Sequence, residues 1–140
     1  MKRILSVLLA AIMLCTMFVA CGKKTAETTE VTVKVTINSG KGNILKDYEV
    51  TIEGAEPTAL DAILYALDTD EITYETSKLQ DRVFFEKIDE YDVEDDAYLW
   101  ELIINDDKKN PASLNTAINN GDKLVLTRTA LELETDVVTK

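Results

Sequence analysis

The segment Val31 to Asn38 alternates strictly between β-branched apolar residues and polar residues. A period of two predicts a strand with one buried face, formed by Val31, Val33, Val35 and Ile37. Ser39 to Asn43 contains two glycines and predicts a turn. Ile44 to Ile52 alternates again, with Ile44, Tyr48, Val50 and Ile52 expected to point inward. The segment from Val31 to Ile52 therefore predicts a β-hairpin that buries one face.

A helix is predicted immediately after this hairpin. Pro57 ends the extended stretch, Thr58 suits the N-cap, and Asp61 three residues later completes a capping box. From Thr58 to Leu67 the apolar residues recur at helical spacing, at Leu60, Ile63, Leu64 and Leu67. We expect this stripe to lie across the inner face of the hairpin.

The middle of the chain carries weaker strand signals. Ile72 to Tyr74 predicts a short strand, and Ser77 to Asp81 a loop. Val83 to Ile88 predicts another strand, in which the two phenylalanines fall on opposite parities. That conflict predicts either a bulge or one exposed aromatic ring.

Tyr98 to Asn105 is the most hydrophobic run outside the N-terminal leader, and it holds the single tryptophan. Apolar residues on both parities predict a central strand. In the following connection, Leu114 and Ile118 are expected to reach the core. Gly121 should supply a positive φ, and Lys123 to Thr129 predicts the last strand.

The N-terminus reads as an export signal. Met1-Lys-Arg is basic, Ile4 to Val19 is apolar, and Phe18-Val-Ala-Cys21-Gly resembles the lipobox of bacterial lipoproteins. This pattern predicts cleavage before Cys21 and acyl chains on its sulfur, which would anchor the protein at the extracytoplasmic face of the cell membrane. The alternative is an ordinary secretory signal in which Cys21 is incidental. The expected organisation is a signal peptide (1–20), a lipidated tether (21–30), a folded domain (31–130) and a tail (131–140).

Charge and residue types exclude several functions. The net charge is −11, and cleavage before Cys21 would remove Lys2 and Arg3 and make it −13. Such an acidic chain repels nucleic acid and anionic lipid. Membrane attachment is therefore expected through the acyl chains on Cys21, which insert into the lipid bilayer, and not through surface charge. The chain has no histidine, and both cysteines, Cys15 and Cys21, lie in the leader region. This excludes Cys–His and Ser–His catalysis and the usual Cys/His zinc sites, so we expect no enzyme, no cofactor and no metal centre.

Six carboxylates crowd into residues 89–96. Calcium takes several oxygen ligands, but the spacing does not match an EF-hand loop and the glycine of its sharp turn is missing. A solvated acidic loop between two strands is the main prediction, with calcium binding as the alternative.

Three motifs are unusual in combination: Thr58 to Ala62, Trp100 to Asn105, and Gly121 to Leu126. Together they resemble the DUF4430 family, which is similar to the C-terminal β-domain of the cobalamin carriers transcobalamin and intrinsic factor. The family often has glycine after the asparagine, where Asp106 stands here. The resemblance implies an α+β fold, with a β-grasp-like mixed sheet and one packed helix. It also implies a non-catalytic surface binding module, with cobalamin or another corrinoid as a candidate ligand.

These observations favour a membrane-anchored, extracytoplasmic binding module for a corrinoid or a cell-surface ligand. The candidate contact residues are Tyr98, Trp100 and Asn105, at the sheet edge. For Trp100 both a core role and ligand stacking are open, and Asn105 and Asp122 are also expected to bond turn backbone. The alternative is a structural or accessory subunit of an envelope transport or adhesion assembly. A carboxylate-based glycosidase is the enzymatic hypothesis to be excluded.

Overall fold

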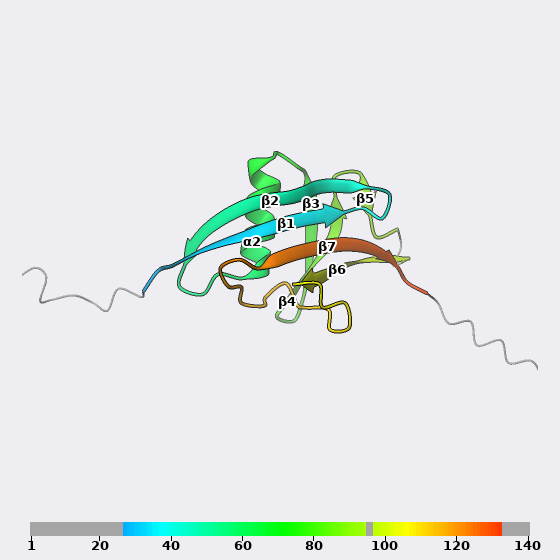
Figure 1. Ribbon diagram of the computed structural model, residues 1–140. Helices are drawn as coiled ribbons and strands as arrows, with labels where there is room; N and C mark the ends of the chain where they lie inside the picture. Colours follow the sequence, from blue (N-terminus) through cyan, green and yellow to red (C-terminus); the bar gives the residue numbers. More distant parts are fainter. Residues whose placement is uncertain (1–26, 95–96, 133–140) are drawn as a thin grey trace, which may run out of the picture.

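A computed structural model describes residues 27–94 and 97–132 (Figure 1). Along the chain, the elements are β1 (Thr29–Asn38), β2 (Asn43–Gly54), α2 (Ala59–Thr69), β3 (Tyr74–Leu79), β4 (Arg82–Ile88), β5 (Tyr91–Asp92), β6 (Tyr98–Ile104) and β7 (Lys123–Ala130). The described part of the chain thus combines strands with one helix, and the predicted α+β class is confirmed.

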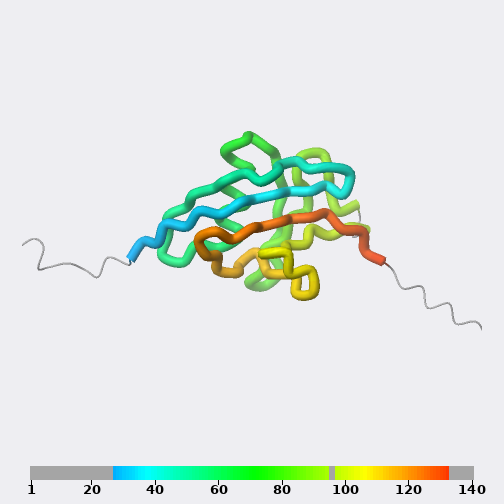
Figure 2. Tube along the Cα trace, viewed as in Figure 1, coloured from blue at the N-terminus to red at the C-terminus, as the bar shows by residue number. Residues whose placement is uncertain are grey.

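Two sheets and the helix form two layers. The larger sheet is mixed, in the order β2–β1–β7–β6, with β1 and β7 parallel and the other pairs antiparallel. The second sheet has the order β3–β4–β5. Figures 1 and 2 show α2 and the β3–β4 hairpin behind the larger sheet, whose opposite face is open. The core lies between these layers and includes the predicted inward residues of β1 together with Leu124 and Leu126 of β7.

The β1–β2 hairpin is confirmed, with one change in its inward set. A register shift occurs opposite Val35 to Ile37, and Asp47 adopts a φ of +48°. This bulge reverses the parity of the residues before it. Leu45 is therefore buried, whereas Ile44, which we expected to point inward, is only partly buried.

Helix α2 begins as predicted. Thr58 is the N-cap, and both bonds of the capping box with Asp61 are present. The buried face is turned from the predicted stripe: Ala59, Ala62 and Ala66 are buried with Ile63 and Leu67, whereas Leu60 and Leu64 are partly buried. Alanine at these positions lets the helix backbone approach the sheet closely, and the prediction underweighted it because alanine adds little to an apolar pattern.

The second sheet differs most from expectation. Ser77 to Leu79, predicted as loop, belongs to β3, and the turn is confined to Gln80 and Asp81. Strand β4 has both features that the parity conflict predicted. Its pairing with β3 is irregular between Glu75 and Thr76, and Phe84 is 44% exposed while Phe85 is buried.

Strand β6 is an edge strand, so its prediction as a central strand is wrong. Its apolar residues on both parities are explained by partial burial along the whole strand, since all except Leu102 are intermediate in exposure. Leu114 and Ile118 reach the core from the β6–β7 connection, as predicted.

Tyr74 links β3 to the end of α2. Its hydroxyl donates a hydrogen bond to Asp68 Oδ1 at 3.0 Å. This bond, assisted by burial and by the negative charge of Asp68, raises the pKa of Tyr74 above the ordinary value of 10.0. A pKa raised by folding adds stability that is complete below the unfolded pKa and disappears as the pH rises through the folded pKa.

We therefore expect Tyr74→Phe to weaken the alkaline loss of stability. Wild-type unfolding free energy, measured by urea denaturation between pH 8 and 11.5, should fall with pH above about 10 more steeply than that of the variant. Equal slopes for the two proteins would contradict a stabilising Tyr74–Asp68 bond.

The leader, the lipidation residue Cys21 and residues 133–140 lie outside the described residues. Within the described ranges, no helix has the length and apolar character needed to cross a membrane. Of the expected tail, Leu131 continues the pairing of β7 through its N–H, which donates to the Ala97 carbonyl at 2.9 Å.

Candidate ligand groove at the edge of strand β6

The backbone of β6 alternates between its partner β7 and the outer edge of the sheet. Asn105 N–H donates to the Lys123 carbonyl, and Leu131 N–H to the Ala97 carbonyl, which fixes the odd-numbered residues as those that face β7. Because β6 pairs with β7 without a register shift, the even-numbered residues present their N–H and C=O groups to the outer edge.

One backbone hydrogen bond is made by this outer edge on each side of Trp100. Tyr98 N–H donates to the Val93 carbonyl at 3.0 Å, and Ala112 N–H donates to the Leu102 carbonyl at 2.8 Å. Between them, the backbone N–H and C=O of Trp100 have no hydrogen-bond partner among the described residues. The Tyr98 carbonyl and the Leu102 N–H have no backbone partner among the described residues either. The unpaired stretch of the edge therefore runs from the Tyr98 carbonyl to the Leu102 N–H, with both backbone groups of Trp100 at its centre.

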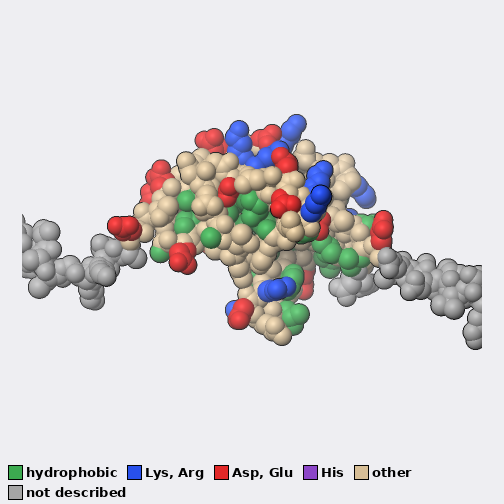
Figure 3. Space-filling model, turned by 60° about the horizontal axis from the view of Figure 1, so that its bottom comes forward, with side chains coloured by type: hydrophobic (Ala, Val, Ile, Leu, Met, Phe, Trp, Pro, Cys, Tyr) green, Lys and Arg blue, Asp and Glu red, His purple; other side chains and the backbone are tan. Residues whose placement is uncertain are grey.

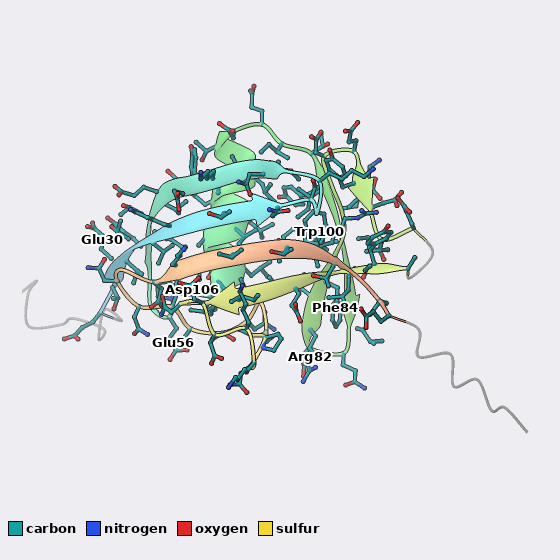
Figure 4. The ribbon with its side chains drawn as sticks, turned by 45° about the vertical axis from the view of Figure 1, so that its right-hand side comes forward. Glu30, Glu56, Arg82, Phe84, Trp100 and Asp106 are labelled. Atoms are coloured by element: carbon teal, nitrogen blue, oxygen red, sulfur yellow. The ribbon has the colours of Figure 1, made fainter. Side chains whose placement is uncertain are left out.

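A groove of about 370 Å³ lies beside this unpaired stretch. One wall is the tip of the β3–β4 hairpin, and another is the start of the β6–β7 connection; the lining residues are Arg82, Val83, Phe84, Trp100, Leu102 and Pro111 to Leu114. Figure 4 shows Arg82, Phe84 and Trp100 in succession, with the hairpin extending below β6. Seen from below, a part of the molecule that projects from the body carries hydrophobic side chains beside charged ones (Figure 3).

The core role of Trp100 is confirmed, and its role in ligand stacking stays a prediction. Its side chain lies on the inner face of β6 with Leu102, packs against the core, and also lines the groove. The indole Nε1 is buried and has no hydrogen-bond partner among the described residues. A buried unpaired N–H costs about 1–3 kcal/mol, so an acceptor that reached this atom would stabilise the folded protein.

Tyr98, the second predicted contact residue, does not line this groove. It packs against Arg128, whose guanidinium carbon lies 3.6 Å from the ring centroid. Arg128 is buried and donates through Nε to the Asp92 carbonyl at 2.7 Å and through Nη2 to Glu94 Oε1 at 2.9 Å. Tyr98 thus belongs to a cation–π cluster that joins β7 to the segment after β5.

Asn105, the third predicted contact residue, stabilises a turn. Its Nδ2 donates to Asp122 Oδ1 at 2.8 Å, and its Oδ1 accepts from Lys123 N–H at 2.9 Å. Asp122 also accepts from Asn119 N–H at 2.8 Å, and Gly121 has a φ of +88°. The predicted turn roles of Asn105, Asp122 and Gly121 are confirmed.

The turn after β6 contains a strained residue. Asn105 and Asp106 have φ values of +52° and +62°, and Asp107 N–H donates to the Ile104 carbonyl at 3.2 Å. Two successive positive φ values are typical of a type I′ turn, which favours glycine at its second central position. Asp106, the second central residue of this turn, therefore sits in a left-handed conformation without being glycine.

We expect Asp106→Gly to raise the unfolding free energy by about 0.5–1 kcal/mol, because glycine adopts this φ without the side-chain clash. The change also removes an exposed 3.6 Å ion pair with Lys123, which contributes little. Asp107→Gly is the control. The Asp107 carboxylate accepts from Asn110 Nδ2 at 3.2 and 3.3 Å, so this variant should lose about 0.5–1 kcal/mol of unfolding free energy.

Chemical denaturation measures the unfolding free energy of both variants. A lower value for Asp106→Gly than for the wild type would contradict backbone strain at Asp106.

The acidic segment 89–96 is described up to Glu94. Tyr91 and Asp92 form β5, and Glu94 forms the ion pair with Arg128. Over residues 27–94 and 97–132, no three acidic, histidine or cysteine side chains are grouped to hold a metal ion. Calcium binding at this segment stays an untested alternative.

Of the three predicted contact residues, the structure places only Trp100 in the groove. The sequence missed Arg82, Phe84 and residues 111–114, which line the groove with it. The parity conflict at Phe84 and Phe85 was the available signal, since it predicted an exposed aromatic ring.

Comparisons with known proteins give a likeness of fold. No protein-family model and no curated protein sequence matches the chain. A crystal structure of haptocorrin in complex with Cbi matches at a TM-score of 0.56 and 14% identity, over 73% of this chain and 25% of the haptocorrin chain. A proposed metal-binding protein from Ruminococcus gnavus ATCC 29149 matches at a TM-score of 0.44 and 18% identity, over 72% of this chain and 98% of that one. This chain thus shares the fold of about a quarter of haptocorrin's length, and membership of DUF4430 stays a prediction.

Proposed function

We propose that this protein is a non-catalytic binding module that holds part of a small-molecule ligand in the groove beside Trp100. The parallel β1–β7 pair in a mixed sheet, with α2 packed behind it, supports a β-grasp-like domain as in the cobalamin carriers. The observation that carries the proposal is the groove itself, whose largely apolar lining includes two aromatic residues, Phe84 and Trp100.

A corrinoid such as cobalamin is the first ligand to test, because the haptocorrin structure that shares this fold contains Cbi. The groove, at about 370 Å³, lies near the lower end of small-molecule sites. It would cover one side of a large ligand, and a second protein surface would cover the rest. The same open groove also favours the alternative function, an accessory subunit whose groove is completed by a partner in an envelope assembly.

Cobalamin titration of the purified protein, followed by equilibrium dialysis, tests the corrinoid. We expect saturable binding that Phe84→Ala weakens about tenfold, through loss of aromatic contact. Tyr65→Ala is the matched control, because Tyr65 is 49% and Phe84 44% exposed, and Tyr65 lies on α2 and does not line the groove. The corrinoid proposal fails if no binding occurs at several hundred micromolar cobalamin, and the groove assignment fails if both variants bind equally.

We further propose that acyl chains on Cys21 hold the protein at the extracytoplasmic face of the membrane. The lipobox-like sequence supports this, and the acidic domain gives no electrostatic attraction of its own. Cys21→Ser should release the protein from membranes into the soluble fraction after a salt wash, whereas Cys15→Ser should not. Retention of the Cys21→Ser protein would refute the lipid anchor.

A further inference from the structure

We infer that the groove recognises an amide group through the backbone N–H and C=O of Trp100. This inference rests on the proposed function, since it names the chemistry of the ligand that the groove would hold. It follows from the unpaired stretch in the edge of β6, which is bounded by the bonded Tyr98 N–H at one end and the bonded Leu102 carbonyl at the other.

Trp100 offers one donor and one acceptor at the centre of this stretch, on the same edge of the strand. In an antiparallel sheet, a neighbouring strand meets such a pair with the N–H and C=O of its own backbone. The protein itself pairs the Tyr98 N–H with the Val93 carbonyl and the Leu102 carbonyl with the Ala112 N–H. A ligand at Trp100 would therefore bind at the centre of a stretch whose two ends are bonded to the protein's own backbone.

An amide fits this pair better than other common groups. A primary amide presents a donor and an acceptor on the same side, and so does one residue of an extended peptide, whereas a carboxylate or an ester carries acceptors only. With an acceptor-only group, the Trp100 carbonyl would face a second oxygen and lose its contact with water. That mismatch is costly wherever the ligand excludes solvent.

Arg82 supports the competing possibility, an anionic ligand, because it is the one charged residue of the groove lining. Its side chain is exposed, so water screens its charge and an ion pair there would be weak. The rest of the lining is apolar apart from Ser113, and it suits the carbon skeleton of an amide-bearing ligand.

Three fragments of equal skeleton test the inference: benzamide, methyl benzoate and benzoate. The readout is the backbone amide resonance of Trp100 in two-dimensional ¹H–¹⁵N spectra of the purified protein. We expect benzamide to shift this resonance saturably, and to bind at least fivefold more tightly than the ester or the anion. Equal or tighter binding of benzoate, or no shift of Trp100 with benzamide, overturns the inference.

A variant that blocks the groove provides a second test of the inference. Ser113→Phe places a ring in the groove at an exposed position, so the fold should be kept, and benzamide binding should fall at least tenfold. Ala117→Phe is the control, an exposed residue of the same connection that does not line the groove. The spectra of both variants without ligand report whether they fold. Undiminished binding by a folded Ser113→Phe protein contradicts the site.

Competition assigns the source of the amide. Displacement of benzamide by a capped dipeptide indicates a peptide backbone, and displacement by cobalamin indicates the carboxamide arms of a corrinoid. Displacement by neither contradicts amide recognition by this groove. Benzamide binding without cobalamin binding would leave the inference standing while the corrinoid proposal fails, so the two failures are distinguishable.

Discussion

Leu67→Ala is expected to lower the unfolding free energy by about 2–5 kcal/mol, because it removes a fully buried side chain from between α2 and the larger sheet. Leu67 is 0% exposed, so the cavity left behind has no route to solvent and the neighbours are already close-packed. For a domain of this size, the melting temperature should fall by roughly 10 °C or more.

Leu64→Ala is the matched control on the same helix. The sequence pattern gave the two leucines equal weight, whereas the structure leaves Leu64 only partly buried. We expect Leu64→Ala to cost no more than about half as much, because part of its surface already contacts water. Equal losses for the two variants, measured by urea denaturation, would contradict the position of the helix face.

Arg128→Ala is the second large expected effect, a loss of about 2–4 kcal/mol. Arg128 is 5% exposed, and its guanidinium makes two hydrogen bonds and stacks on Tyr98. Hydrogen bonds of charged groups contribute about 1.5–3 kcal/mol, and a desolvated cation–π contact about 2 kcal/mol, with incomplete additivity. The pair with Glu94 itself adds little, since the glutamate side chain is 61% exposed.

Two further variants separate charge from shape. Arg128→Lys keeps the charge but lacks the planar fork that bonds and stacks at once, so it should lose most of the same stability. Lys123→Ala removes an exposed cation from the same strand and should change stability by less than about 0.5 kcal/mol. If Arg128→Lys leaves the thermal stability unchanged, the positive charge alone is what this position requires.

Local signals in the sequence predicted the elements whose determinants are local. The alternation at Val31 to Ile37, the Thr58–Asp61 capping box and the positive φ of Gly121 each depend on neighbours within a few residues. All three are present in the structure.

Non-local packing explains the wrong predictions. Strand β6 was predicted to be central because its odd- and even-numbered residues are both apolar. Its position at the edge of the sheet follows from tertiary structure, namely its pairing with β7 and the isolated bridge from Leu102 to Ala112, which the local pattern does not encode. Leu45 replaced Ile44 because a bulge at Asp47 reversed the parity, and no residue type announces such a bulge. Of the candidate site, Trp100 was predictable as a lone tryptophan in a strand. The parity conflict signalled an exposed ring at Phe84 or Phe85, but not that Arg82 and Phe84 lie beside Trp100, since 16 or more residues separate them from it and only the fold brings them together.

The indole ¹H–¹⁵N resonance of Trp100 tests the central claim most directly, because the chain has one tryptophan and the signal needs no assignment. Cobalamin is added to the purified protein at a concentration at which dialysis shows it bound. The groove assignment predicts a saturable shift of this resonance, together with the backbone resonances of Arg82, Phe84 and Ser113. Bound cobalamin that leaves the indole resonance unmoved, and shifts residues on the open face of the larger sheet instead, would contradict it.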